Sequence, residues 1–203
     1  MKVCILDYGS GNVKSVYNLI KTITNNVIIS NNNSDLNEAT HLILPGVGAF
    51  GASMEKIKKK IDLNLLKELV FKGKKPFLGI CVGMQVLADK GYEFGEYDGL
   101  GWIHGKVVQL ESKKLPLPHI GWNNVNIKNN CKLVTGINND FDFYFLHSYV
   151  FEVLDNKKAM TITEYGTEFV SIVNQDNIYG VQFHPEKSQI AGKKIIQNFL
   201  NFC

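Results

Sequence analysis

The stretch PFLGICVGMQVL (residues 76–87) joins an apolar strand pattern to a helical pattern, with a cysteine at the junction. Glycine weakens both strands and helices, so Gly79 and Gly83 on either side of Cys81 require a reason. A strand-to-helix elbow supplies one, because the backbone there turns sharply and holds a nucleophile over the sheet, which needs small neighbours. We therefore expect a strand over 76–80, a helix beyond the elbow and a nucleophile at Cys81.

Strand and helix patterns alternate through the first half of the chain. Apolar runs predict strands over residues 2–7, 26–30 and 41–45, and amphipathic runs predict helices over 13–23, over 54–71 and from 84 onward. Strands that are apolar throughout are typical of a parallel sheet with helices on both faces. The segment 89–102, which is rich in glycine and acidic residues, is predicted to be a surface loop.

The second half changes to apolar runs that are separated by turns. These runs predict strands, several of them antiparallel, in GKVVQL (105–110), GWNNVNI (121–127), DFYFLHSYVF (142–151), AMTITEY (159–165), FVSIVN (169–174) and NIYGVQF (177–183). We expect them to extend the same sheet, before a final helix over 188–201 that Ser188 caps. The predicted fold class is α/β, an open and mostly parallel sheet flanked by helices with additional antiparallel strands, in a single domain over residues 1–203.

Charge and hydropathy exclude several classes of partner. All 22 basic residues are lysine, and the net charge is only +3. The densest lysine cluster, KIKKKID (56–62), has no interleaved aromatic residues, so a solvated helix face is favoured over a nucleic-acid site. No apolar run approaches the roughly 20 residues that span a bilayer, and the N-terminal segment runs into a strand without a cleavage site. A cytoplasmic chain with neither a nucleic-acid nor a membrane partner is expected.

The cysteines other than Cys81 have no special setting. Cys4 lies in an apolar strand pattern and is interpreted as a small core residue. Neither Cys131 nor Cys203 forms a CxxC pair or has a histidine at a metal-like spacing. No disulfide framework, metal site or cofactor is therefore predicted.

A base for Cys81 is expected at His184. Among the five histidines, His184 ends a strand pattern, and Glu186 follows two residues later in GVQFHPEKSQ (180–189). In extended backbone the side chains of residues i and i+2 point to the same side, so Glu186 can accept from Nδ1 and leave Nε2 to face the thiol. A lone histidine near a strand end is more often structural, so this hypothesis depends on its combination with the elbow.

A third element is the glycine-rich turn LPGVGAFG (44–51), which follows a strand directly. Its backbone N–H groups, together with the N–H of Val82, could form an oxyanion hole for acyl transfer. A plain tight turn would also use Pro45 and these glycines, and both interpretations remain open from the turn alone.

Taken in order, these motifs resemble the class I glutamine amidotransferases, and among them the glutaminase subunits of imidazole glycerol phosphate synthases. The matching segments are LDYGSGN (6–12), PGVGAF (45–50), GICVGMQ (79–85), PHIGWN (118–123), YFLHSY (144–149) and GVQFHPEKSQ (180–189). They extend over essentially the whole chain. The resemblance implies hydrolysis of glutamine to glutamate and ammonia, without a cofactor, and a class I amidotransferase (flavodoxin-like) fold.

The resemblance also assigns roles to individual residues. It makes Cys81 the nucleophile, His184 the general base and then acid, and Glu186 the residue that orients it. The N–H groups of Val47 and Val82 become the oxyanion donors, with that of Val47 in place only when the partner's site is filled. The remaining assignments are glutamine contacts at Gly48, Gln85, Ser148 and Tyr149, and partner contacts at Asn12, Trp122, Tyr144 and Lys187.

The partner that the resemblance implies is a (β/α)₈ cyclase subunit, joined to this chain as a heterodimer in histidine biosynthesis. The absence of arginine agrees with this division of labour, because the phosphorylated substrate would be bound by the other subunit. Two alternatives remain open from the sequence. One is a paralogous amidotransferase that feeds a different synthase, such as one that amidates a surface sugar. The other is a regulatory or scaffolding subunit without activity on the same fold.

Overall fold

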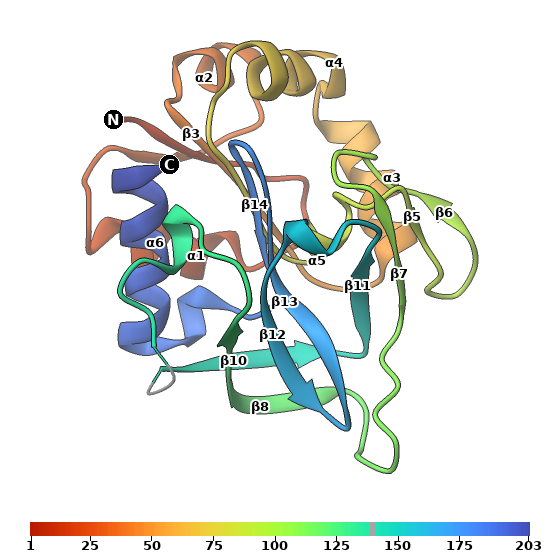
Figure 1. The fold of residues 1–203 in the computed structure, drawn as a ribbon. Coiled ribbons are helices and arrows are strands. Elements are labelled where there is room, and N and C mark those ends of the chain that lie inside the picture. Colours follow the sequence, from red (N-terminus) through yellow and green to blue (C-terminus); the bar gives the residue numbers. More distant parts are fainter. Residues whose placement is uncertain (139–140) are drawn as a thin grey trace.

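The computed structural model describes residues 1–138 and 141–203, and its centre is an eight-stranded sheet (Figure 1). The strand order is β2-β1-β3-β4-β14-β13-β12-β9. The first five strands are parallel, and β13, β12 and β9 continue the sheet antiparallel. The bounds are β1 (Val3–Ile5), β2 (Val27–Ile29), β3 (His41–Gly46), β4 (Phe77–Cys81), β9 (Asn126–Ile127), β12 (Ala159–Tyr165), β13 (Thr167–Gln175) and β14 (Ile178–Val181).

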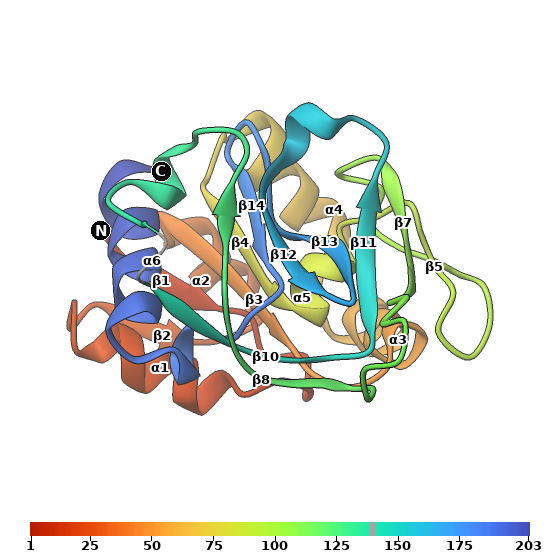
Figure 2. The ribbon, with the colours of Figure 1, turned by 60° about the horizontal axis from the view of Figure 1, so that its bottom comes forward.

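Helices cover both faces of this sheet, as the apolar strands predict. Every residue of β1, β3, β4 and β14 is buried. Helices α1 (Val13–Lys21) and α6 (Gln189–Phe202) lie in contact on one side, and α3 (Phe50–Lys60) and α4 (Leu63–Lys67) lie on the other (Figures 1 and 2). The short helices are α2 (Asn33–Glu38) and α5 (Val82–Gln85), with a π turn over Glu68–Lys72 and 3₁₀ turns over Lys132–Val134, Asn156–Lys158 and Pro185–Lys187.

Two small sheets stand apart from the central one, so the expectation that every later strand extends the same sheet is wrong. β8 (His119–Asn124) pairs antiparallel with β10 (Asp142–His147), and Figure 2 shows the pair side by side. The other small sheet has the order β11-β7-β5-β6, with β11 (Tyr149–Val153), β7 (Gly105–Gln109), β5 (Lys90–Gly91) and β6 (Tyr97–Asp98).

The predicted strand over 142–151 therefore divides at Ser148. β10 alternates buried and exposed residues and ends at His147, and β11 starts at Tyr149 in a different sheet. A continuous apolar run cannot reveal this corner, because both halves satisfy the same strand pattern. The run 121–127 divides in the same way, between β8 and β9.

Some predicted helix and loop bounds also change. The helix expected over 54–71 breaks after Lys60, and Asp62 then caps α4 by accepting from the backbone N–H groups of Asn64 and Leu65 at 3.1 Å each. The segment 89–102 is not entirely loop, since it contains β5 and β6.

Ser188 occupies the N-cap position of α6, but its side chain makes no capping bond. The hydroxyl donates instead to the His184 carbonyl oxygen at 2.7 Å and accepts from the Tyr144 backbone N–H at 2.9 Å. Ser188 therefore ties the segment that carries His184 to β10. Cys4 is fully buried in the core, as expected. None of the helices in the described part of the chain is both long and apolar enough to cross a membrane.

Candidate active site

Cys81 lies at the junction of β4 and α5 in a strained conformation. Its φ of 56° and ψ of −113° place a non-glycine residue in a rarely populated region. A Cβ at Gly79 would lie 2.3 Å from the Gly83 carbonyl oxygen, and one at Gly83 would lie 1.8 Å from the Leu44 carbonyl oxygen. Small neighbours are therefore needed for the close approach of β3, β4 and α5, while the unusual turn is made by Cys81 itself.

His184 and Glu186 meet beside this thiol. The Nδ1 atom of His184 lies 2.9 Å from Oε1 of Glu186, and the two side chains are 3% and 1% exposed. The predicted contact is present, but the extended backbone that was predicted to produce it is not. Residues Pro185–Lys187 form a 3₁₀ turn after His184, and this turn, not an extended i and i+2 pair, returns the carboxylate to the ring.

The surroundings favour the protonated form of His184. Burial opposes the charge, but hydrogen bonds with Cys81 and Glu186 outweigh it and raise the pKa of His184 to about 10. Because Nδ1 faces the carboxylate, Nε2 is the ring atom that is available to the thiol. A cysteine reacts as its thiolate, and His184 is the proton carrier that lies beside Cys81.

The second oxygen of the Glu186 carboxylate, Oε2, is buried with no hydrogen-bond partner among the described residues. An unpaired buried carboxylate oxygen destabilises the fold. A residue with a purely structural role would avoid this cost, so the arrangement favours a functional role for Glu186.

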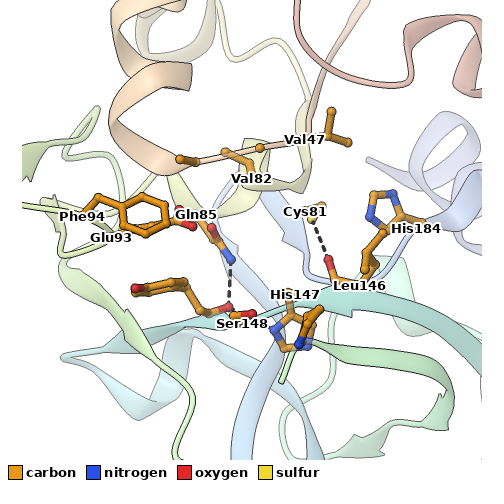
Figure 3. A pocket seen from close by; sticks show the side chains of 14 residues that line it. Val47, Cys81, Val82, Gln85, Glu93, Phe94, Leu146, His147, Ser148 and His184 are labelled. Carbon is orange, nitrogen blue, oxygen red and sulfur yellow. Dashed lines mark hydrogen bonds between the residues drawn. The ribbon is translucent and has the colours of Figure 1, made fainter. Parts of the chain in front are cut away.

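The thiol opens into a pocket of about 280 Å³ (Figure 3). Every residue predicted for the oxyanion hole and for glutamine lines it, together with two of the triad: Val47, Gly48, Cys81, Val82, Gln85, Ser148, Tyr149 and His184. Figure 3 shows Val47, Cys81 and His184 at one end of this pocket, with Gln85, Glu93 and Phe94 at the other. The geometry thus brings residues from five separate segments of the sequence to one cavity.

The amide of Gln85 is already engaged within the protein. Its Nε2 donates to the Tyr149 carbonyl oxygen at 2.9 Å and to Oε1 of Gln182 at 3.0 Å. The carbonyl oxygen of Gln85 is therefore the atom that remains to contact a ligand. Gln182, which sequence reasoning missed, is fully buried and directs its own Nε2 to Sγ of Cys81 at 3.7 Å. A donor at that position stabilises negative charge on the sulfur.

The glycine-rich turn (44–51) lies beside the thiol, and the carbonyl of Val47 in this turn is held by a hydrogen bond. Ser10 donates its hydroxyl to the Val47 carbonyl oxygen at 2.8 Å. Gly48 has a φ of 94°, and a Cβ there would meet nothing within 4 Å, so conformation alone requires glycine at this position. Gly46 differs, because a Cβ there would lie 2.6 Å from the Tyr8 hydroxyl.

Sequence reasoning also missed Glu93, which lies in the segment expected to be surface loop. It lines the pocket and accepts from the Phe50 backbone N–H, at the start of α3, at 2.8 Å. Burial raises the pKa of Glu93, and the hydrogen bond from Phe50 opposes that rise. No local pattern marks this glutamate, because only the path of the chain between α5 and β7 brings it to the pocket.

Three of the four predicted partner contacts gather on one surface. Trp122 on β8 and Tyr144 on β10 are directly opposed, with ring centroids 6.0 Å apart. The Lys187 Nζ atom lies 5.2 Å from the centroid of the Tyr144 ring. Asn12 is separate, at the N-cap position of α1. No cluster of side chains suited to a metal ion occurs in residues 1–138 and 141–203.

An elbow cysteine, a histidine–carboxylate pair and a pocket over a mostly parallel sheet define a class of enzyme. Residues 4–202 match the family described as glutamine amidotransferase class-I, and the chain belongs to this family. A crystal structure titled as a glutamine amidotransferase has the same fold, with a TM-score of 0.76 over 98% of this chain and 97% of that one at 18% identity. The structure of PurLQS from Thermotoga maritima has a TM-score of 0.75, over 99% of this chain and 98% of that chain, at 20% identity.

Closer relatives narrow the class. The chain is 44% identical to the imidazole glycerol phosphate synthase subunit HisH of Pelagibacter ubique, over 99% of this chain and all of that protein. It is also 44% identical to the HisH subunit of Methanocaldococcus jannaschii, over 97% of each. The resemblance found in the motifs is thus confirmed over nearly the full length.

Proposed function

We propose that this chain is the glutaminase subunit of an imidazole glycerol phosphate synthase and supplies ammonia for histidine biosynthesis. The observation that carries the proposal is Cys81, held at a strained elbow against the buried His184–Glu186 pair inside the pocket. The relatives at 44% identity carry the name of that subunit.

The chemistry follows from the positions of these side chains. The Cys81 thiolate attacks the carboxamide carbon of glutamine, and the N–H groups of Val82 and Val47 receive the negative charge on the oxygen. His184 then donates its Nε2 proton to the departing nitrogen, so that ammonia leaves and a thioester remains. The neutral ring next takes a proton from water, which attacks the thioester and releases glutamate. Glu186 holds the ring in the required tautomer through both steps.

Substrate recognition uses the other lining groups. The Gln85 carbonyl oxygen, Gly48 and the Ser148–Tyr149 segment contact the glutamine molecule. Its α-ammonium requires an anion, and Glu93 is the carboxylate in the lining of the pocket.

The ammonia passes to a (β/α)₈ cyclase partner that docks over Trp122, Tyr144 and Lys187, with Asn12 at its margin. This surface exposes large apolar side chains next to the pocket, including Ile120 at 58%, Trp122 at 48% and Leu146 at 37%. Exposed apolar groups of this kind mark interaction sites. Lys187 is positioned to pair with a carboxylate of the partner.

The test is glutamate release by the purified chain, alone and then with the cyclase subunit of the same organism, with and without that subunit's ribonucleotide. We expect a low rate alone, a large rise with the liganded partner and no activity in a Cys81→Ala chain. Binding without activation by the cyclase, or no binding, would assign the ammonia to another synthase. An unchanged rate in the Cys81→Ala chain would refute the mechanism.

A further inference from the structure

A chain of four hydrogen-bonded groups lies behind the wall of the pocket. His119 and His147 are the last opposed pair of β8 and β10, and Nδ1 of His119 lies 3.1 Å from Nε2 of His147. Nδ1 of His147 lies 3.0 Å from the Tyr149 carbonyl oxygen. At the other end, Nδ2 of Asn123 lies 3.5 Å from Nε2 of His119.

The chemistry of these groups fixes every proton in the chain. A carbonyl oxygen only accepts, so Nδ1 of His147 carries a hydrogen and its Nε2, in a neutral ring, accepts. Nδ1 of His119 must then donate, which leaves Nε2 of His119 to accept from Asn123. Burial keeps both rings neutral, because it lowers the pKa of His119 to about 4 and that of His147 to about 3.

Aromatic contacts hold both rings in place. The His119 ring is stacked against Tyr165, at 4.0 Å between centroids, and against Phe145, at 5.0 Å. The Phe169 ring meets His147 edge-on at 4.9 Å. Neither imidazole can therefore flip about its Cβ–Cγ bond, which would put ring carbons in place of the bonded nitrogens, without displacing these neighbours.

The chain ends at the corner where two sheets meet. His147 closes β10, Tyr149 opens β11, and both line the pocket with Ser148 between them. The carbonyl oxygen of Tyr149 also accepts from Gln85, so a single oxygen joins the histidine chain to α5. In Figure 3 the His147 ring lies on the side of the pocket opposite to Val47 and Val82.

We propose that His147, oriented by His119, is a positioning residue that fixes the Ser148–Tyr149 wall for glutamine by donating Nδ1–H to the Tyr149 carbonyl. This inference rests on the proposed function, since it assigns glutamine to the pocket. It makes the donor atom of His147, and not the volume of its ring, the property that matters for binding.

Two substitutions separate the donor from the volume. His147→Asn places an amide N–H near the position of Nδ1 and keeps the bond to Tyr149, but it leaves a larger cavity. His147→Gln fills more of the volume and can accept from His119, but it loses the donor to Tyr149. A role in packing alone predicts that Gln is the milder change in every respect.

The measurement is the KM and kcat for glutamine in the activated complex, together with the melting temperature of each variant. We expect His147→Gln to raise KM about tenfold and His147→Asn less than about threefold, with kcat little changed, since one buried hydrogen bond is lost in the first and kept in the second. The melting temperature is expected to fall more in His147→Asn. A KM order that follows the melting temperatures would overturn the proposal.

Alkylation of Cys81 by iodoacetamide, protected by glutamine, separates this result from failure of the proposed function. If the unaltered chain shows no glutamine protection and no glutaminase activity, the proposed function fails. If it shows both, and both variants keep the KM of the unaltered chain, the positioning role of His147 alone is refuted.

Discussion

Two histidine pairs flank the same pocket and are held in opposite charge states. His184 and His147 are 3% and 6% exposed, so desolvation acts on both. His184 nevertheless has a raised pKa, and His147 has a lowered one. The difference lies in their partners, because His184 bonds the Glu186 carboxylate and the Cys81 thiol, whereas His147 bonds a second imidazole and a carbonyl oxygen.

Burial by itself therefore does not decide what a histidine does in this protein. A carboxylate partner produces a ring that carries and transfers a proton, which is the requirement for catalysis. A neutral partner produces a ring with a fixed donor and a fixed acceptor, which is the requirement for positioning. The two pairs divide these tasks beside one cavity.

The largest expected effect comes from removing the charge that distinguishes the pairs. Glu186→Gln keeps the shape of the side chain but makes the partner of His184 neutral. Glutamate release in the activated complex is expected to fall by about 10²–10⁴-fold, because the imidazolium loses its counter-charge and the tautomer is no longer fixed. Steady-state kinetics with glutamine check this, with complex formation as the control. A fall of less than tenfold in an intact complex would show that Glu186 does not orient the base.

The opposite pKa shifts also predict that the free energy of unfolding passes through a maximum as the pH is varied. The folded protein binds protons less readily at His119 and His147, whose pKa values lie at about 4 and about 3 against an ordinary 6.5, so their contribution to stability is lost as the pH falls below 6.5. The folded protein binds a proton more readily at His184, so that contribution is full below pH 6.5 and is lost as the pH rises toward 10.

Urea unfolding at a series of pH values measures this dependence, with an acid arm where stability falls below pH 6.5 and an alkaline arm where it falls toward pH 10. We expect Glu186→Gln to flatten the alkaline arm and His119→Gln to flatten the acid arm, each without changing the other. A variant that lowers the unfolding midpoint equally at every pH would indicate a packing defect instead of a titration.

The donor to the thiol gives a smaller effect. Gln182→Met removes the N–H beside Sγ of Cys81, together with the oxygen that accepts from Gln85, but keeps an unbranched side chain of similar length. The rate of Cys81 alkylation by iodoacetamide at neutral pH is expected to fall about 3–10-fold, as for loss of one hydrogen bond to a charged group. Gln175→Met, which loses a contact with the Trp102 carbonyl oxygen away from the pocket, is the matched control. Equal rates in the two variants would contradict a role for Gln182.

The two pairs also differ in how far the sequence predicts them. Cys81, His184 and Glu186 lie in short motifs whose spacing carries the chemistry, and the structure brings them together. His119 and His147 lie in two of the segments that match the family, 28 residues apart, but nothing in those segments pairs the two rings, and only the antiparallel register of β8 and β10 opposes them. Glu93 and Gln182 reach the site through long-range packing in the same way. The alternating elements predict the parallel sheet, whereas the corner at Ser148 has no local signal.

The smallest effect is expected from a substitution that gives the neutral His119–His147 pair a carboxylate partner, as the charged His184 has in Glu186. Asn123→Asp replaces Nδ2, which lies 3.5 Å from Nε2 of His119, with a carboxylate oxygen, so the ring gains a partner that favours its protonated form, while the bond from Nδ2 to the Glu164 carbonyl oxygen is lost. The pKa of His119 should rise above its value of about 4, and the acid arm of the stability curve should become shallower. Asn123 is half-buried and its contact is long, so we expect a change below about 1 kcal/mol, measurable as the midpoint of the His119 ring resonances in an NMR titration. Asn124→Asp, which adds the same charge to the neighbouring exposed position, is the control. If both variants raise the pKa of His119 equally, the added net charge and not the contact with residue 123 sets the charge state of the ring. The conclusion that the bonded partner decides the charge state of a buried histidine would then be wrong.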